Sequence, residues 1–113
     1  MLLKEQLDEL LSDVVKAAKT VFGDKLNDVI LFGSYARGDF DDESDVDIMI
    51  IADIGNSGTY GYSGKLHELL SKTEIENACV FSFCITDTKK FRELSSILPF
   101  YKNVLKDGVH FAA

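Results

Sequence analysis

The sequence predicts a single α+β domain of the two-layer α/β type, spanning residues 1–113. Two observations support this fold class. The chain is 46% hydrophobic over 113 residues, which is enough apolar material for one compact core and little more. Apolar residues recur at helical spacing near the N-terminus, and short β-branched or aromatic runs follow, each closed by glycine or polar residues. Helices and strands therefore share one small domain.

Helices and strands are expected to alternate along the chain. Residues 2–21 carry leucine, valine and alanine on one helical face and are followed by Gly23, so they predict an amphipathic helix. Ser34 stands where the N-cap of a helix would follow the first strand. We expect strands over residues 29–32, 45–52 and 79–86 and a helix over residues 65–72. A further helix, capped by Asp87 or Thr88, is expected to run through Ile97, and residues 101–106 are expected to form a last turn after Pro99. Segments 37–44 and 53–64 are expected to be loops, the second glycine-rich and a candidate lid over a binding site.

The charge balance limits the partners that the protein can bind. Its formal net charge is −7, so the overall field repels nucleic acid and anionic membranes, and we expect direct binding of neither. A polyanionic substrate would have to be held locally, most simply by divalent cations. The chain begins without the apolar stretch of a signal peptide, and no apolar run approaches the ~18 residues of a membrane span. A cytoplasmic location is therefore expected.

Gly33-Ser34 is the first candidate binding element. It lies at a predicted strand-to-helix turn, where glycine lets the backbone approach a ligand and the amides that begin a helix attract phosphate. A Gly-Ser pair after a strand is more often an ordinary turn and cap. The pair therefore needs a second feature before it indicates a phosphate site.

Asp45 and Asp47 supply that second feature. Because strand side chains alternate, the two carboxylates share one face, with Cα atoms roughly 7 Å apart. Two carboxylates in this arrangement can converge on a hard cation. The alternative is a pair of solvated charges on an edge strand beside an acidic loop.

The two features and the ten residues 35–44 between them resemble the signature of the DNA polymerase β-type nucleotidyltransferase superfamily. Residues 33–38, Gly-Ser-Tyr-Ala-Arg-Gly, are similar to those of its minimal prokaryotic members, and the tail segments 98–104 and 107–109 are similar with lower specificity. The resemblance implies a nucleotidyltransferase fold, in which helices flank a small mixed β-sheet. It also implies transfer of a nucleoside monophosphate from a nucleoside triphosphate, with ATP as the expected donor, to a hydroxyl group.

The resemblance assigns roles to individual residues. Asp45 and Asp47 would be catalytic and would hold one or two Mg²⁺ ions, while Gly33 and Ser34 would bind the triphosphate. Arg37 is a candidate second phosphate contact through its guanidinium group. An ion pair between Arg37 and an acid at position 39, 41 or 43 is the alternative.

The chain departs from the family pattern at a third carboxylate, which active members carry on the neighbouring strand. Residues 77–84 contain no acid, and alignment through the tail puts the missing carboxylate at Ala78. Glu76 would share a face with Ala78 if the strand extended that far, so it is the candidate catalytic substitute. Glu74 is a weaker candidate. The alternative for Glu76 is a solvated charge at the entry to the strand.

The sequence leaves two functions open. The first is a Mg²⁺-dependent nucleotidyltransferase that acts on a protein side chain, a small molecule or a nucleotide end. The second is a catalytically weak or silent antitoxin or scaffold, because many minimal relatives pair with a HEPN-domain ribonuclease toxin and neutralise it by binding or by adding AMP. A small domain leaves little mass to enclose a large substrate, so a toxin partner or a homo-oligomer is compatible with either function.

Overall fold

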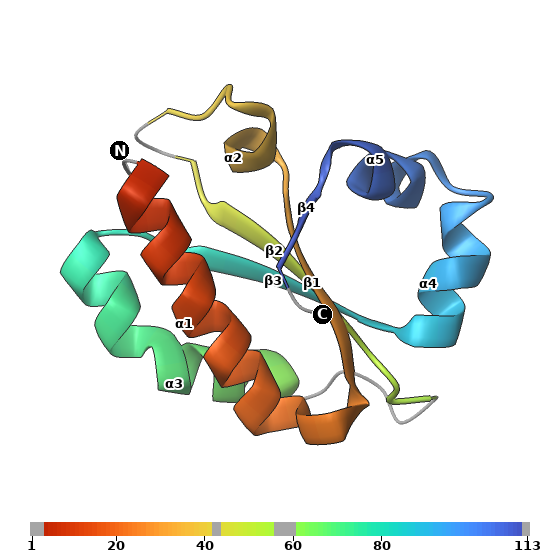
Figure 1. Ribbon diagram of the computed structural model, residues 1–113, viewed down its shortest axis with the longest axis horizontal. Coiled ribbons are helices and arrows are strands. Elements are labelled where there is room, and N and C mark those ends of the chain that lie inside the picture. Colours follow the sequence, from red (N-terminus) through yellow and green to blue (C-terminus); the bar gives the residue numbers. More distant parts are fainter. Residues whose placement is uncertain (1–3, 42–43, 56–60, 112–113) are drawn as a thin grey trace.

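The computed structural model describes residues 4–41, 44–55 and 61–111, in which helices and strands alternate as Figure 1 shows. In chain order they are α1 (Lys4–Phe22), the 3-10 helix η1 (Gly23–Lys25), β1 (Leu26–Phe32), α2 (Ser34–Arg37), β2 (Val46–Ala52), α3 (Tyr62–Asn77), β3 (Phe81–Asp87), α4 (Thr88–Ser95), α5 (Pro99–Asp107) and β4 (Val109–His110). None of the helices in these ranges is long and apolar enough to cross a membrane.

The described strands form one mixed sheet in the order β3-β2-β1-β4. Strand β1 is antiparallel to both β2 and β4, whereas β2 and β3 are parallel. A parallel pair requires a crossover connection, and α3 supplies it between β2 and β3. The predicted mixed sheet with flanking helices is therefore confirmed.

Helices cover both faces of the sheet, so the molecule has three layers rather than the predicted two. Helices α1 and α3 lie on one face, and α4 and α5 lie on the other (Figure 1). Strand β2 divides its side chains between the two cores, as its alternating pattern predicts. Ile48 and Ile50 pack with α1 and α3, while Met49 and Ile51 pack with Phe91 of α4. The second core escapes sequence analysis because α4 and α5 are short and each contributes few buried residues.

Several element boundaries differ from the predicted ones. Strand β1 begins at Leu26, because cross-strand pairing with β2 continues from Asp28 to Leu26 across a register shift at position 27. Helix α3 runs over Tyr62–Asn77 rather than 65–72, and Tyr62 packs its ring 4.8 Å from that of Phe22. Strand β3 correspondingly starts later, at Phe81. Tertiary contacts, rather than local propensity, set these ends.

The proposed lid segment 53–64 does not lie over the candidate aspartates in its described parts. Asp53 and the two residues after it follow the C-terminal end of β2, whereas Asp47 is near its N-terminal end. Residues 62–64 belong to α3. Residues 56–60, which include Tyr60, lie outside the described residues.

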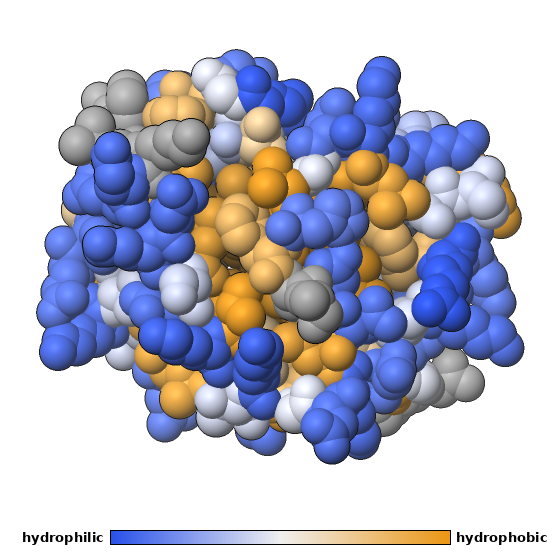
Figure 2. All heavy atoms as spheres, viewed as in Figure 1, coloured by the Kyte–Doolittle hydropathy of each residue, from blue (hydrophilic) through white to orange (hydrophobic). Residues whose placement is uncertain are grey.

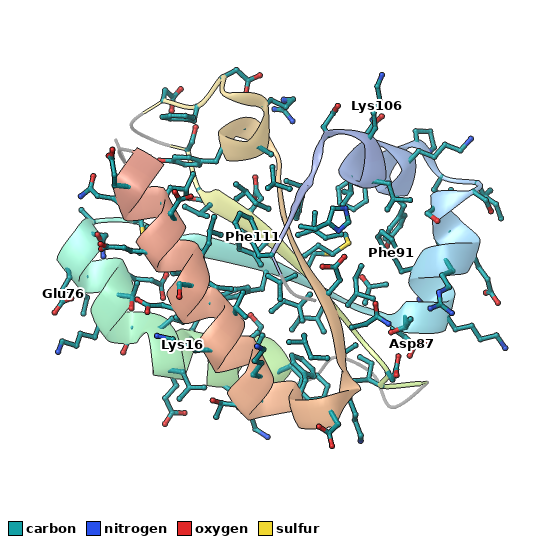
Figure 3. All side chains as sticks on the ribbon, viewed as in Figure 1. Lys16, Glu76, Asp87, Phe91, Lys106 and Phe111 are labelled. Carbon is teal, nitrogen blue, oxygen red and sulfur yellow. The ribbon has the colours of Figure 1, made fainter. Side chains whose placement is uncertain are left out.

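The C-terminal tail joins the sheet through a short strand that the sequence does not predict. In β4, Val109 and His110 pair with Leu31 and Ile30 of β1, and the Phe111 amide donates a hydrogen bond to the Val29 carbonyl at 2.8 Å. Figure 3 shows Phe111 beside α1, and Figure 2 shows apolar atoms gathered along the middle of the same face. Two paired residues are too few for a sequence pattern, so only tertiary pairing reveals this strand.

Asp87 ties the end of β3 to the start of α4, as predicted for a helix cap (Figure 3). Its carboxylate accepts hydrogen bonds from the backbone amides of Ile54 at 3.1 Å, Gly55 at 2.7 Å and Lys90 at 3.3 Å. The Gly55 amide is the main reason that the pKa of the Asp87 carboxyl lies below its ordinary value, because these bonds favour the ionised form.

Replacing Asp87 by alanine is expected to lower the melting temperature and to flatten its dependence on acidic pH. Because the folded pKa lies below the unfolded one, the carboxylate stabilises the fold fully above about pH 4 and loses this effect as the pH falls through the folded pKa. Thermal unfolding between neutral and acidic pH would measure both effects, with Asp24→Ala as the exposed-acid control. Parallel curves for wild type and Asp87→Ala would contradict the assignment.

Candidate functional site

Four of the predicted site residues line a cavity at the end of the sheet where β1 stops and β2 starts. Phe32 of β1 pairs with Asp47 of β2, so Gly33 follows immediately beside the carboxylate. The cavity has a volume of about 410 Å³. It is lined by Phe32, Gly33, Ser34 and Arg37 from the β1–α2 segment, Asp47 from β2, and Phe100, Asn103, Val104 and Asp107 from α5. In Figure 1, α2 and α5 lie at the same end of the sheet. A volume of this size is typical of a small-ligand site.

Gly33 is required by its position. Its backbone has φ 74° and ψ −153°, a conformation that is essentially restricted to glycine. A Cβ atom at this position would lie 2.3 Å from Oδ2 of Asp47, so the backbone and the carboxylate are in direct contact. Gly33, rather than Ser34 as predicted, is the N-cap of α2, and Ser34 is the first helical residue. The Gly33 carbonyl accepts hydrogen bonds from the amides of Ala36 and Arg37, both at 3.1 Å.

Tyr35 anchors this short helix to the protein core. Its side chain is buried, and its ring stacks on that of Phe40 with centroids 4.3 Å apart. A helix of four residues has little stability of its own, because nucleation fixes several residues for the first hydrogen bond. The Tyr35 anchor therefore holds Ser34 and Arg37 at the cavity.

Asp45 and Asp47 lie close enough for their charges to interact, but Asp45 is outside the strand predicted to hold both. Asp47 is the second residue of β2 and is half-buried, whereas Asp45 precedes the strand and is exposed. Burial raises the pKa of the Asp47 carboxyl, repulsion from Asp45 raises this pKa further, and attraction to Arg37 opposes both effects. A bound divalent cation would relieve the repulsion, and carboxylate oxygens are its preferred donors. The donor set thus fits a magnesium ion.

Arg37 forms the ion pair that the sequence offered as one alternative and also lies where it could contact a phosphate, which was the other. Its Nε donates to Oδ2 of Asp39 at 3.2 Å, and both side chains are largely exposed, so the ion pair adds little stability. Arg37 also lines the cavity and lowers the pKa of Asp47. A guanidinium group has five N–H donors, so the Asp39 bond leaves Arg37 able to contact a phosphate.

The predicted strand position of Glu76 is wrong. Glu76 lies in the last turn of α3 and forms an exposed ion pair with Lys72, with 3.8 Å between Oε1 and Nζ. Ala78 is the left-handed C-cap of the same helix, and β3 starts only at Phe81. Helix α3 packs on the sheet face opposite to the cavity, so the sheet separates Glu76 from Asp47. Figure 3 shows Glu76 at the end of α3, on the side of the molecule away from Lys106 of α5.

Ser82, rather than Ala78, occupies the position beside the aspartates on the neighbouring strand. It pairs with Asp47 in the parallel register of β2 and β3 and shares its face, because Phe81 and Phe83 point into the opposite core. Within the described residues, no group of three acidic, histidine or cysteine side chains is placed to hold a metal ion. A hydroxyl group, rather than a carboxylate, therefore stands beside Asp47 on the neighbouring strand.

Helix α5 contributes a cavity wall that sequence reasoning missed. Phe100, Asn103 and Asp107 all line the cavity, and their spacing puts them on one face of the helix. The available signal was Pro99, which is the first residue of α5 and marks its start. The spacing of the three residues after Pro99 would have identified a shared face, but not what that face contacts.

Comparison with known proteins places this geometry in a family. A family model described as a nucleotidyltransferase domain matches residues 4–107. Two relatives from Methanocaldococcus jannaschii each carry the name "Putative protein adenylyltransferase". One is 30% identical over 101 residues, which make up 89% of this chain and 93% of the relative. The other is 52% identical over 46 residues, 41% of this chain and less than half, 46%, of the relative.

Solved structures agree with this assignment. A crystal structure described as a "putative nucleotidyltransferase" from Sulfolobus solfataricus is 25% identical, with a TM-score of 0.57 over 94% of this chain and 81% of that one. A chain from the crystal structure of a toxin–antitoxin with AMP-PNP has a TM-score of 0.55 over 88% of this chain and 69% of that one. At 22% identity, this second similarity shows the fold alone. Because the family model matches nearly the whole chain around the Gly33–Asp47 site, the protein belongs to the nucleotidyltransferase domain family.

Proposed function

We propose that the protein transfers AMP from ATP to a hydroxyl group in a Mg²⁺-dependent reaction. The observation that carries this proposal is the direct contact between the Gly33 backbone and the Asp47 carboxylate. Gly33 has no side chain, so its backbone can approach phosphates, and the Asp47 carboxylate suits a hard cation. The contact places these two groups within a few ångströms of each other. The two names "Putative protein adenylyltransferase" among the relatives support ATP as donor and a protein as acceptor.

Each residue of the Gly33–Asp47 site has a defined role in the proposed reaction. Asp45 and Asp47 would hold one or two Mg²⁺ ions, which when bound neutralise phosphate charge and polarise the α-phosphorus. Gly33 and Ser34 bind the β- and γ-phosphates through the backbone and the serine hydroxyl, and Arg37 contacts an outer phosphate oxygen. The acceptor oxygen attacks the α-phosphorus, the bond between that phosphorus and the α,β-bridging oxygen breaks, and pyrophosphate leaves with this oxygen. The proton of the acceptor hydroxyl passes to solvent water. The chain thus positions both reactants and stabilises negative charge.

A second function, a catalytically weak or silent antitoxin that binds a HEPN-type ribonuclease, is favoured by Ser82. A hydroxyl at the third carboxylate position, where Ser82 pairs with Asp47, removes one anionic metal ligand and one proton acceptor. The structural similarity to a toxin–antitoxin chain is compatible with such a partner. The enzyme and the silent antitoxin differ in whether nucleotide binding leads to transfer.

Calorimetry with the wild-type protein tests the proposed function. A non-hydrolysable ATP analogue is titrated into the protein in the presence of Mg²⁺ and, separately, of EDTA. We expect binding of the analogue that depends on Mg²⁺. In a separate assay with α-labelled ATP, we expect transfer of the label to a co-expressed HEPN-type toxin. Binding without transfer would favour the silent antitoxin, and the absence of Mg²⁺-dependent binding would contradict both the metal site and the enzyme.

Ser82→Asp is expected to strengthen the metal site. A carboxylate at this position would lie beside Asp47 on the same sheet face and add a third anionic ligand. Metal affinity rises with the number of charged ligands, so we expect the Kd for Mg²⁺ in the presence of nucleotide to fall roughly tenfold and transfer to accelerate. Ser82→Asn is the matched control, because it has the same shape without the charge. Equal affinities for the two variants would show that position 82 does not reach the metal.

A further inference from the structure

The cavity has two chemically different walls. The α2 wall presents Ser34 and the cationic Arg37, while the α5 wall presents Phe100, Asn103 and Asp107. The first set suits a polyanion. The second combines an aromatic ring, an amide and a carboxylate, which together suit an uncharged ring system that carries hydrogen-bonding groups.

Phe100 is an aromatic side chain that is fixed in place but not covered. Its ring makes an edge contact with Phe32, with centroids 5.7 Å apart, and another with the Tyr101 ring at 5.1 Å. Even so, 47% of Phe100 remains exposed. A ring held by two others and still half-exposed to a cavity offers a rigid stacking surface at low entropic cost. The Phe32 contact also fixes this surface next to Gly33 and its neighbour Asp47.

Charge sets the direction in which a nucleotide would enter this cavity. Asp107 at the end of α5 would repel a triphosphate, whereas Arg37 of the α2 wall attracts one. The triphosphate is therefore favoured along α2 and the aspartate pair, and the nucleoside along α5. In this orientation the carboxylate of Asp107 is available to accept hydrogen bonds from ribose hydroxyl groups.

We propose that α5 is the nucleoside-binding wall and that Phe100 stacks on the nucleotide base. This inference rests on the proposed function and adds to it the residue that recognises the base. Exposure alone does not single out Phe100, because Leu105 of the same helix is 44% exposed. Leu105 is absent from the cavity lining, whereas Phe100 belongs to it. Phe100 is thus distinguished by its place in the cavity lining.

Two ligands and three variants test the proposal. The ligands are the non-hydrolysable ATP analogue and inorganic tripolyphosphate, each with Mg²⁺, titrated by calorimetry. Phe100→Leu keeps an apolar side chain against Phe32 and removes the aromatic face, whereas Phe100→Tyr retains that face. Leu105→Ala is the control for a change on the same helix outside the cavity. Melting temperatures establish that each variant is folded.

The expected pattern is specific to stacking. Phe100→Leu should weaken binding of the analogue about tenfold, because stacking of an aromatic side chain on a base contributes on the order of that factor or more. Binding of tripolyphosphate should be unchanged, and Phe100→Tyr should bind both ligands as wild type does. An equal loss for both ligands, or an unchanged affinity for the analogue in Phe100→Leu, would overturn the proposal while leaving the proposed function intact. Failure of the wild type to bind the analogue would overturn both.

Discussion

Asp47→Asn is expected to abolish Mg²⁺-dependent nucleotide binding without destabilising the fold. Asparagine retains the shape of the side chain but removes the charge that fits the cation. Removing a residue that only hydrogen-bonds to a metal ligand lowers metal affinity by about 10–100-fold. Loss of a carboxylate that binds the metal directly should therefore weaken Mg²⁺-dependent nucleotide binding by at least about 100-fold. Calorimetry with the ATP analogue and Mg²⁺ measures this effect. Asp45→Asn should weaken binding in the same direction.

The stability of Asp47→Asn distinguishes a functional carboxylate from a structural one. The pKa of Asp47 is raised in the folded protein, mainly by burial and then by repulsion from Asp45. A raised carboxyl pKa means that the folded state holds the proton more tightly, so stability is lost as the pH rises through the folded pKa. At neutral pH the ionised group therefore opposes folding, and Asn should preserve or raise the metal-free melting temperature. A marked fall would identify Asp47 as a structural residue instead.

Gly33→Ala is expected to damage both stability and the site. Because the backbone at position 33 adopts a conformation that only glycine tolerates, any other residue there should lower the free energy of unfolding by about 1–3 kcal/mol. The added Cβ would also lie 2.3 Å from Oδ2 and 3.1 Å from Cγ of Asp47, so the carboxylate must move. Because Asp47 is a proposed metal ligand, nucleotide binding should fall together with the melting temperature. Thermal unfolding and calorimetry on the same sample measure the two effects.

Gly38→Ala separates backbone strain from the contact with Asp47. Gly38 is the left-handed C-cap of α2, with φ 83° and ψ 9°, and a Cβ atom there would meet no atom within 4 Å. Its substitution should cost about 1–2 kcal/mol of stability through backbone strain alone. Nucleotide binding should stay near that of wild type. If Gly33→Ala and Gly38→Ala bound nucleotide equally well, the Gly33–Asp47 contact would have no role in the site.

Errors of a few residues in element boundaries caused the main failure of sequence reasoning at the site. Alignment through the tail put the missing acid at Ala78, and extending the third strand back beyond Ala78 put Glu76 on the same strand face. In the structure, α3 continues to Asn77 and Ala78 caps it, so both residues belong to a helix end. Because strand side chains alternate and helices cover opposite sheet faces, such a shift transfers a residue to the wrong side of the sheet. The position of Ser82 beside Asp47 is known only from the pairing of β3 with β2 in the structure.

The sequence by itself determined the mixed-sheet fold class and the candidate group formed by Gly33, Ser34, Asp45 and Asp47. The mixed sheet was implied by the family resemblance, whereas the candidate group depends on residues close together in the chain, where turn chemistry and side-chain alternation act locally. Only the tertiary structure decided which residues face this group. Helix α5 supplies the second wall, with Phe100 against Phe32, because folding brings the C-terminal segment onto the end of β1. Contacts between distant segments depend on how whole layers pack, and local patterns do not encode them.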